Sequence, residues 1–205
     1  MIAIVDYNAG NLTSVQLALE SLQAPAEVCR DPERIRAAER VIFPGVGAAG
    51  ASMENVQAFG LQNVLCEVIE RGTPFLGICV GMQILLTHSE EDGGTDCLGM
   101  LDGEVRRFPA DIDGCKIPQM GWNTVRFRQK HALFDGIDDN SEFYFVHSYY
   151  PAPADSGVTM AETEYASVTF ASVAGRDNLV ATQFHPEKSG RIGLRFLKNF
   201  VTWDG

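Results

Sequence analysis

The amino-acid sequence predicts an α/β protein with a mixed, mostly parallel central sheet flanked by helices. Three observations carry this prediction. In the first half of the chain, short apolar runs alternate with segments of helical periodicity, which is typical of parallel sheets. In the second half, apolar runs are separated by Gly, Asp and Pro turns, which favours antiparallel strands. Between the halves, a G-x-C-x-G motif at 77–81 ends an apolar run, as at a sharp turn from a strand into a helix.

The first half contains four expected strands. They are residues 2–5, 27–29, 41–43 and 74–78. The helix expected after the first strand buries one face, made of Val15, Ala18, Leu19 and Leu22. Asn11 is its expected N-cap, because Asn is among the residues that satisfy free amides at a helix start. Residues 51–71 are expected to be helical, and residues 81–86 to form the helix that follows the G-x-C-x-G turn.

The second half is expected to add five strands and a closing helix. The strands are residues 101–108, 122–127, 143–149, 167–173 and 179–184. The helix has an apolar face made of Ile192, Phe196, Leu197 and Phe200. The sequence shows no internal repeat and no low-complexity linker, so a single domain over residues 1–205 is expected.

Composition and charge exclude several classes of function. A net charge of −11 argues against nucleic acid or an anionic membrane as the partner. No basic secretory leader opens the sequence, and no run approaches the ~18 apolar residues of a membrane span. The five cysteines form no C-x-x-C motif, which argues against a disulfide framework or a zinc site. We therefore expect a cytoplasmic protein without a metal or cofactor.

The G-x-C-x-G motif predicts a nucleophile elbow with Cys79 at its apex. Gly77 and Gly81 would relieve clashes in a strained turn. The start of the following helix would favour the thiolate form of Cys79. The backbone amide of Val80 would donate to an oxyanion on the carbonyl that the sulfur attacks. Alone, the motif is equally compatible with the buried end of a strand.

A base for this thiol is expected in the segment that follows the strand 179–184. His185 and Glu187 are two residues apart, so in extended chain they point to the same side, and Pro186 stiffens the arrangement. A thiol nucleophile needs a base, and the base needs an acceptor to orient it. His147 is the alternative base, although a histidine in an aromatic strand is more often a buried pocket residue.

The glycine-rich segment 45–50 has two interpretations. It matches G-x-G-x-x-G after an apolar strand, which permits a dinucleotide site. Against this, Pro44 precedes the first glycine and no acidic residue ends a strand about 20 residues later. The preferred interpretation is an oxyanion loop in which a backbone amide near Val46 is the second donor.

Three sequence blocks, taken together, resemble the class I (triad) glutamine amidotransferases. They are residues 44–47, 77–83 and 184–187. Four further blocks resemble the glutaminase subunits of imidazole glycerol phosphate synthases, which act in histidine biosynthesis. These are residues 7–12, 118–123, 144–149 and 185–189. The resemblance covers nearly the whole chain and includes no synthase domain. It implies a class I glutamine amidotransferase-like fold and a cyclase on a separate chain.

The resemblance also implies a mechanism and a set of site residues. Cys79 would form a glutamyl thioester, and His185, oriented by Glu187, would protonate the departing ammonia. Glutamine, the substrate, would be bound by Gly47, Gln83, Glu91, Ser148 and Tyr149. The cyclase, as heterodimer partner, would contact Asn11, Trp122, Asn123 and Lys188. The sequence leaves an alternative open for three of these residues: Gln83 as an exposed helix residue, Glu91 as part of an acidic loop, and Trp122 as a core aromatic residue.

Three other functions are compatible with parts of this pattern. The nearest is a glutaminase subunit of another ammonia-channelling synthase. A stand-alone thiol hydrolase or peptidase would share the elbow, and a binding module without activity would need none of the triad chemistry.

Overall fold

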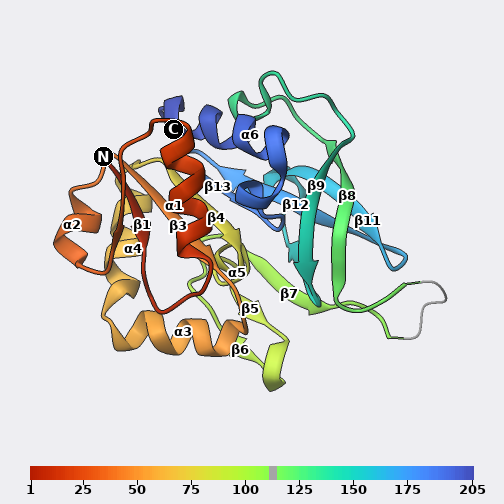
Figure 1. Cartoon of the computed structure of the whole chain (residues 1–205). Helices are drawn as coiled ribbons and strands as arrows, with labels where there is room; N and C mark the ends of the chain where they lie inside the picture. Colours follow the sequence, from red (N-terminus) through yellow and green to blue (C-terminus); the bar gives the residue numbers. More distant parts are fainter. Residues whose placement is uncertain (111–114) are drawn as a thin grey trace.

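The computed structural model, which describes residues 1–110 and 115–205, is built on a large twisted sheet (Figure 1). Its nine described strands, in spatial order, are β2 (Ala26–Cys29), β1 (Ile2–Val5), β3 (Arg40–Gly45), β4 (Phe75–Cys79), β13 (Leu179–Thr182), β12 (Val168–Arg176), β11 (Thr159–Tyr165), β8 (Gln119–Phe127) and β9 (Ser141–His147). Neighbouring strands from β2 to β13 pair in parallel, and those from β13 to β9 pair antiparallel. The predicted mixed sheet is confirmed.

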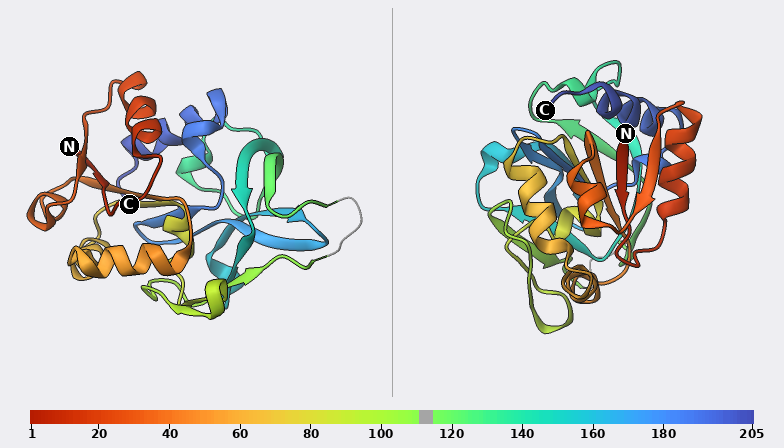
Figure 2. Two further views of the ribbon diagram at one scale, coloured as in Figure 1. Left: turned by 60° about the horizontal axis from the view of Figure 1, so that its bottom comes forward. Right: turned by 90° about the vertical axis from the view of Figure 1, so that its left-hand side faces the viewer.

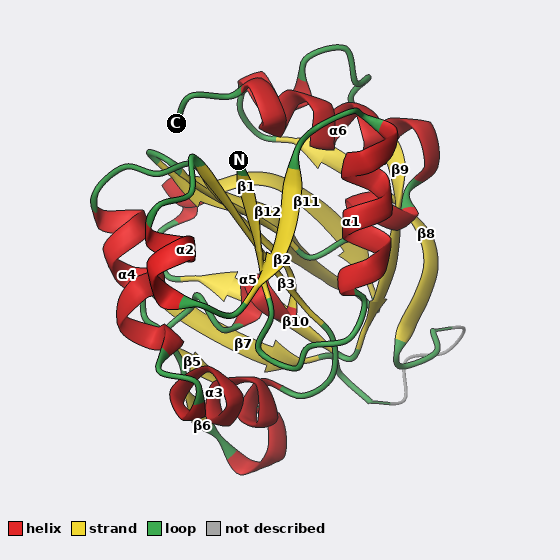
Figure 3. Cartoon of the chain, turned by 60° about the vertical axis from the view of Figure 1, so that its left-hand side comes forward, coloured by secondary structure: helices red, strands yellow, loops and turns green. Residues whose placement is uncertain are grey.

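Helices cover both faces of the parallel part of the sheet (Figure 3). The helices α1 (Leu12–Ser21) and α6 (Gly190–Thr202) lie together on one face, and α2 (Pro32–Arg36), α3 (Ala49–Ala58) and α4 (Leu61–Glu70) lie on the other. Parallel strands covered in this way are buried on both sides, and β1, β3 and β4 are accordingly almost continuous apolar runs. No helix among the described residues is long and apolar enough to cross a membrane.

The antiparallel half of the chain extends away from the helical layer (Figure 2). A second described sheet contacts the antiparallel part of the large sheet through β10 (Tyr149–Pro153) and β12. Its strands are, in spatial order, β10, β7 (Gly103–Arg107), β5 (His88–Ser89) and β6 (Thr95–Asp96). The remaining described elements are α5 (Val80–Gln83) and the short 3-10 turns η1 (Glu91–Gly93), η2 (Ala132–Phe134), η3 (Ser156–Val158) and η4 (Pro186–Lys188). This second sheet brings the segment around Ser148 up to the end of β4.

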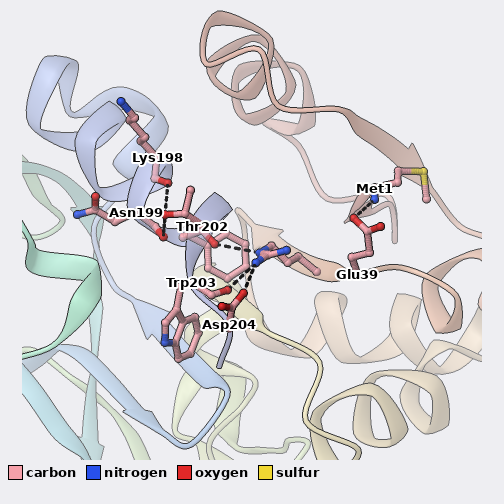
Figure 4. A network of polar contacts seen from close by, with 9 residues as sticks. Met1, Glu39, Lys198, Asn199, Thr202, Trp203 and Asp204 are labelled. Carbon is pink, nitrogen blue, oxygen red and sulfur yellow. Dashed lines mark hydrogen bonds and ion pairs between the residues drawn. The ribbon is translucent and has the colours of Figure 1, made fainter.

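The two ends of the chain are fastened to the start of β3 (Figure 4). The amino group of Met1 forms an ion pair with Glu39. The guanidinium of Arg40 donates to the carbonyl of Trp203 over 2.8 Å and pairs with Asp204 over 3.2 Å. These contacts hold the end of α6 against the sheet, and α6 follows directly on the segment that carries His185 and Glu187.

Two helical predictions are wrong in their boundaries. Residues 51–71 form two helices, α3 and α4, because the chain breaks at Gly60, which has a φ of 64°. The helix expected over 81–86 ends at Gln83. The carbonyls of Ile84 and Leu85 accept from the amides of Leu98 and Leu101, so the helical ladder cannot continue.

Two strand predictions and one cap also differ from the structure. The strand expected over 143–149 is two strands, β9 and β10, because the chain turns at Ser148 to pair with β7. The strand β11 was not expected, since Glu162 and Glu164 interrupt its apolar pattern. Asn11 precedes α1 but does not cap it: its φ is 74°, and its side chain donates to Glu187 instead.

Glycines allow β3 to lie directly against the turn after β4. A Cβ on Gly81 would lie 1.9 Å from the carbonyl oxygen of Phe43. A Cβ on Gly77 would lie 2.7 Å from the side chain of Leu85. The prediction is confirmed at Gly81, where the obstacle is backbone, whereas at Gly77 it is mainly the side chain of Leu85. Neither glycine has a positive φ.

Gly81→Ala is therefore expected to destabilise the fold by about 3 kcal/mol or more, because the new methyl meets backbone that cannot move aside. The matched control is Gly60→Ala, where no atom lies within 4 Å of an added Cβ. This variant should lose only about 1 kcal/mol of stability, the cost of a non-glycine residue in the left-handed conformation. Urea unfolding of both variants provides the measurement. Equal losses of stability would mean that the close packing at Gly81 is unimportant.

Candidate active site

Cys79 lies at the apex of a strained turn at the carboxyl end of β4. Its φ is 55° and its ψ is −112°, a conformation that non-glycine residues rarely adopt. Gly45 is its neighbour across the β3–β4 ladder. Cys79 lines a cavity at this edge of the sheet, which is where ligands bind in open α/β sheets. The predicted strained elbow is confirmed.

His185 and Glu187 lie beside this elbow and are linked to each other. The distance between Nδ1 of His185 and Oε1 of Glu187 is 2.7 Å, and their side chains are 1% and 0% exposed. Glu187 Oε1 also accepts from the side-chain amide of Asn11. Since Glu187 holds Nδ1, the free ring nitrogen Nε2 of His185 is left for a reacting group; it makes no hydrogen bond among the described residues.

The charge on His185 depends on its two acidic neighbours. Burial lowers the pKa of the imidazole, but the Cys79 thiolate and the Glu187 carboxylate outweigh it and raise the pKa from 6.5 to about 10. At neutral pH His185 is therefore an imidazolium held between Cys79 and Glu187. The contribution of His185 to stability is complete below about pH 6.5 and is lost as the pH rises through about 10.

A cavity of about 260 Å³ opens in front of Cys79. It brings together eight residues singled out from sequence: Val46, Gly47, Cys79, Val80, Gln83, Glu91, Ser148 and Tyr149. Pro118, Val146 and His147 complete the lining. The first eight come from four separate parts of the chain, and the structure brings them together around one cavity.

Gln83 and Glu91 have definite partners in this cavity. Gln83 is only 3% exposed, so the alternative of an exposed helix residue is wrong. Its Nε2 donates to the Tyr149 carbonyl over 3.0 Å and to Oε1 of Gln183 over 2.9 Å. Glu91 accepts from the amide of Ala49 over 2.7 Å, and burial raises the pKa of its carboxyl group.

The contact between Glu91 and Ala49 bears on the dinucleotide interpretation of 45–50. Ala49 is the first residue of α3, and the N-terminus of this helix is where a pyrophosphate would bind. The amide of Ala49 already donates to the Glu91 carboxylate, and this carboxylate would repel a phosphate. The structure therefore favours the oxyanion-loop interpretation, in which Gly47, with a φ of 100°, lines the cavity beside Cys79.

His147 does not have the surroundings of a charged base. It is 6% exposed and packs against three phenylalanine rings. Burial lowers its pKa to about 4, so the ring is neutral at physiological pH. Its Nδ1 lies 2.7 Å from the Tyr149 carbonyl and must therefore carry a hydrogen. These contacts make His147 a wall of the cavity.

The residues expected at a partner interface do not all gather in one place. Trp122 is 54% exposed, so the core-aromatic alternative is wrong, and its ring meets that of Tyr144 at 6.2 Å. Lys188 is exposed on η4. Asn123 follows Trp122 along β8 and so points to the opposite face, where it donates to the Glu164 carbonyl. Asn11 contacts Glu187, as described above.

Two buried polar residues at the site were missed by the sequence reasoning. Gln183 is fully buried, and its Nε2 lies 3.6 Å from the Cys79 sulfur. A glutamine that interrupts an apolar strand just before His185 was the signal available in the sequence. Tyr7 is also buried, beneath the elbow, and a Cβ on Gly45 would lie 2.1 Å from its hydroxyl. Burial raises the pKa of Tyr7, so its phenol is neutral.

The two histidines are expected to differ sharply on substitution. His185→Ala removes the imidazolium and should abolish glutamine turnover, whereas His147→Ala removes a ring that is neutral above about pH 4 and should leave alkylation of Cys79 by iodoacetamide intact. The measurements are turnover and alkylation rate at neutral pH. The reverse result, with turnover surviving loss of His185, would identify His147 as the base.

Comparisons with known proteins agree with this geometry. The family model "Glutamine amidotransferase class-I" matches residues 3–203. The imidazole glycerol phosphate synthase subunit HisH of Herpetosiphon aurantiacus is 51% identical over 98% of this chain and 93% of its own length. The HisH subunit of Moorella thermoacetica is 53% identical over 97% of this chain and 93% of its own length.

Solved structures show the same fold at low sequence identity. A protein described as a glutamine amidotransferase has a TM-score of 0.74 at 18% identity, over 98% of this chain and 99% of the other. The glutaminase domain of Trypanosoma brucei CTPS with bound acivicin has a TM-score of 0.68 at 16% identity, over 100% and 94%. The chain therefore belongs to the class-I glutamine amidotransferase family and, within it, to the HisH subunits of imidazole glycerol phosphate synthase.

Proposed function

We propose that this chain hydrolyses glutamine to glutamate and ammonia at Cys79 and delivers the ammonia to a separate cyclase subunit that makes imidazole glycerol phosphate. The observation that carries the proposal is the pair of His185 and Glu187, joined over 2.7 Å and buried beside a strained cysteine that faces a cavity. Family membership supplies the reaction, and this constellation supplies the groups that the reaction needs.

The first half of the reaction uses the charge pair between Cys79 and His185. The thiolate attacks the side-chain amide carbon of glutamine, and the amides of Val80 and Val46 hold the oxyanion that forms. His185 donates its proton from Nε2 to the departing ammonia, leaving a glutamyl thioester. Glu187 keeps the proton on Nδ1 and so keeps the ring in the right orientation.

The second half regenerates the enzyme. His185, now neutral, takes a proton from water as the water oxygen attacks the thioester carbonyl. The same two backbone amides hold the second oxyanion. The C–S bond then breaks, glutamate leaves, and Cys79 returns as a thiolate beside the imidazolium. The protons balance because the one given to ammonia is recovered from water.

Substrate recognition is assigned to Gly47, Gln83, Glu91, Ser148 and Tyr149. The Glu91 carboxylate, half-buried at the cavity rim, suits the α-ammonium group of glutamine. Backbone and hydroxyl groups near Ser148 suit its α-carboxylate. The neutral ring of His147 adds no charge to compete with these contacts.

The partner surface is assigned to the region around Trp122 and Lys188. Asn11 and Asn123 are assigned to the partner by the family resemblance alone, because Asn123 lies on the opposite face of β8 and Asn11 contacts Glu187. Met120 and Trp122 are 66% and 54% exposed on β8, which makes an apolar anchor for a docked protein. The strongly acidic chain is not suited to nucleic acid or to an anionic membrane. We assign the protein to the cytoplasm, consistent with its free cysteines, and residues 1–205 to one domain, consistent with a sheet that runs through both halves.

Glutaminase activity is expected to be low alone and to rise when the cyclase and its nucleotide substrate are added, because ammonia released without a partner serves no synthesis. The assay is glutamate formation with and without the cyclase, and Cys79→Ala is the blank. High activity that ignores the cyclase would instead favour a stand-alone thiol hydrolase. Recovery of a different synthase by co-purification would favour another ammonia-channelling enzyme.

Glu91→Gln separates the charge of Glu91 from its structural contact. The amide oxygen of the new side chain can still accept from Ala49, so the fold should be unchanged, but the loss of charge should raise the KM for glutamine about tenfold or more. The matched control is Glu90→Gln, whose side chain is exposed and accepts from Arg107. Equal KM values for both variants would remove Glu91 from the binding site.

A further inference from the structure

The carboxamide of Gln183 is a buried hydrogen-bond donor that faces the nucleophile. Its Nε2 lies 3.6 Å from the Cys79 sulfur, and the residue is 0% exposed. The backbone amide of Gln183 donates to the Ser172 carbonyl over 2.9 Å, which fixes the chain at this point. The contact between the carboxamide and the sulfur is therefore buried.

The orientation of the Gln183 carboxamide follows from two hydrogen bonds whose donor and acceptor can be assigned. The Tyr149 carbonyl can only accept, so the atom of Gln83 that lies 3.0 Å from it must be Nε2. The same Nε2 lies 2.9 Å from the carboxamide of Gln183, so the atom there must be the oxygen. The nitrogen of Gln183 then necessarily faces the sulfur.

We propose that Gln183 is a catalytic residue that donates a hydrogen bond to the Cys79 thiolate, and that Gln83 is a positioning residue that sets its direction. This inference rests on the proposed role of Cys79 as the nucleophile. The hydrogen bond stabilises negative charge on sulfur, so it favours the reactive form before attack. It also favours the thiolate as the leaving group when the thioester breaks.

The same chain of partners constrains how Gln83 meets the substrate. Its amino group has two hydrogens, and the Tyr149 carbonyl and the Gln183 oxygen use both. Only Oε1 of Gln83 is left to face the cavity. Gln83 therefore accepts from a donor group of glutamine, and a ligand that offers an acceptor at this place is disfavoured.

The donated hydrogen bond can be measured without glutamine or the cyclase, through the rate of Cys79 alkylation by iodoacetamide across a pH series. The titratable groups facing Cys79 are His185 and Tyr7, with His147 behind His185, and Glu187 faces His185. None of these groups is changed in the variants below. A shift in the pH profile of Gln183→Met then reports the loss of the carboxamide alone, whereas Gln183→Glu and Gln83→Glu also add a carboxylate.

Gln183→Met keeps the length of the side chain and removes the donor. The midpoint of the pH profile of alkylation should move up by about one pH unit. Gln183→Glu accepts from Gln83 and turns a carboxylate oxygen toward the sulfur, so a larger upward shift of the midpoint is expected. Gln83→Glu cannot donate to Gln183, and the carboxamide should turn its oxygen to the sulfur, with a similar upward shift.

The matched control is Ser172→Ala, which removes a buried hydroxyl next to the same backbone contact and should leave the profile unchanged. Thermal unfolding of each variant shows whether it is folded. The inference is overturned if the folded Gln183→Met and Gln183→Glu proteins keep the wild-type profile. If the wild type shows no glutaminase activity although alkylation depends on Gln183, the proposed function fails and this inference stands.

Discussion

The close approach of β3 to the turn after β4 is the constraint on which the rest of the site depends. Gly81 packs against the Phe43 carbonyl, and Gly45 lies beside Cys79, at distances that leave no room for a Cβ. Because the backbone cannot relax, Cys79 is held at a φ of 55°, with its sulfur outside the sheet. The same packing sets the glycine-rich loop after β3 beside the sulfur, where its amides can serve an oxyanion.

Electrostatics then decide what this geometry can do. In a buried site an unpaired thiolate or imidazolium would be costly, and each here has a partner. Glu187 stabilises the charge of His185, and His185 stabilises that of Cys79. The Tyr149 carbonyl can only accept a hydrogen bond, so it fixes the orientation of the Gln83 carboxamide, and Gln83 in turn fixes that of Gln183. The result is a charged relay that needs no rearrangement of protein charge before it reacts.

Much of this arrangement could be predicted from the sequence, and the rest could not for identifiable reasons. The elbow at Cys79 and the strands around it have local signals: glycine spacing, apolar runs and extended alternation. The early end of α5 depends on hydrogen bonds from the amides of Leu98 and Leu101, which no local pattern records. The break at Gly60 is a local feature, because this glycine has a φ of 64°. Asn11 was expected to cap a helix, but Glu187, 176 residues away, takes its side chain.

The proposed triad depends on the charge of His185. A ¹⁵N NMR titration of the His185 ring in the wild-type protein measures this charge directly. We expect an imidazolium at about pH 8, with loss of the proton only near pH 10, because the Cys79 thiolate and Glu187 stabilise the charge. A neutral imidazole at about pH 8 would contradict this expectation, since the thiolate would then have no counter-charge and the triad no proton to give to ammonia.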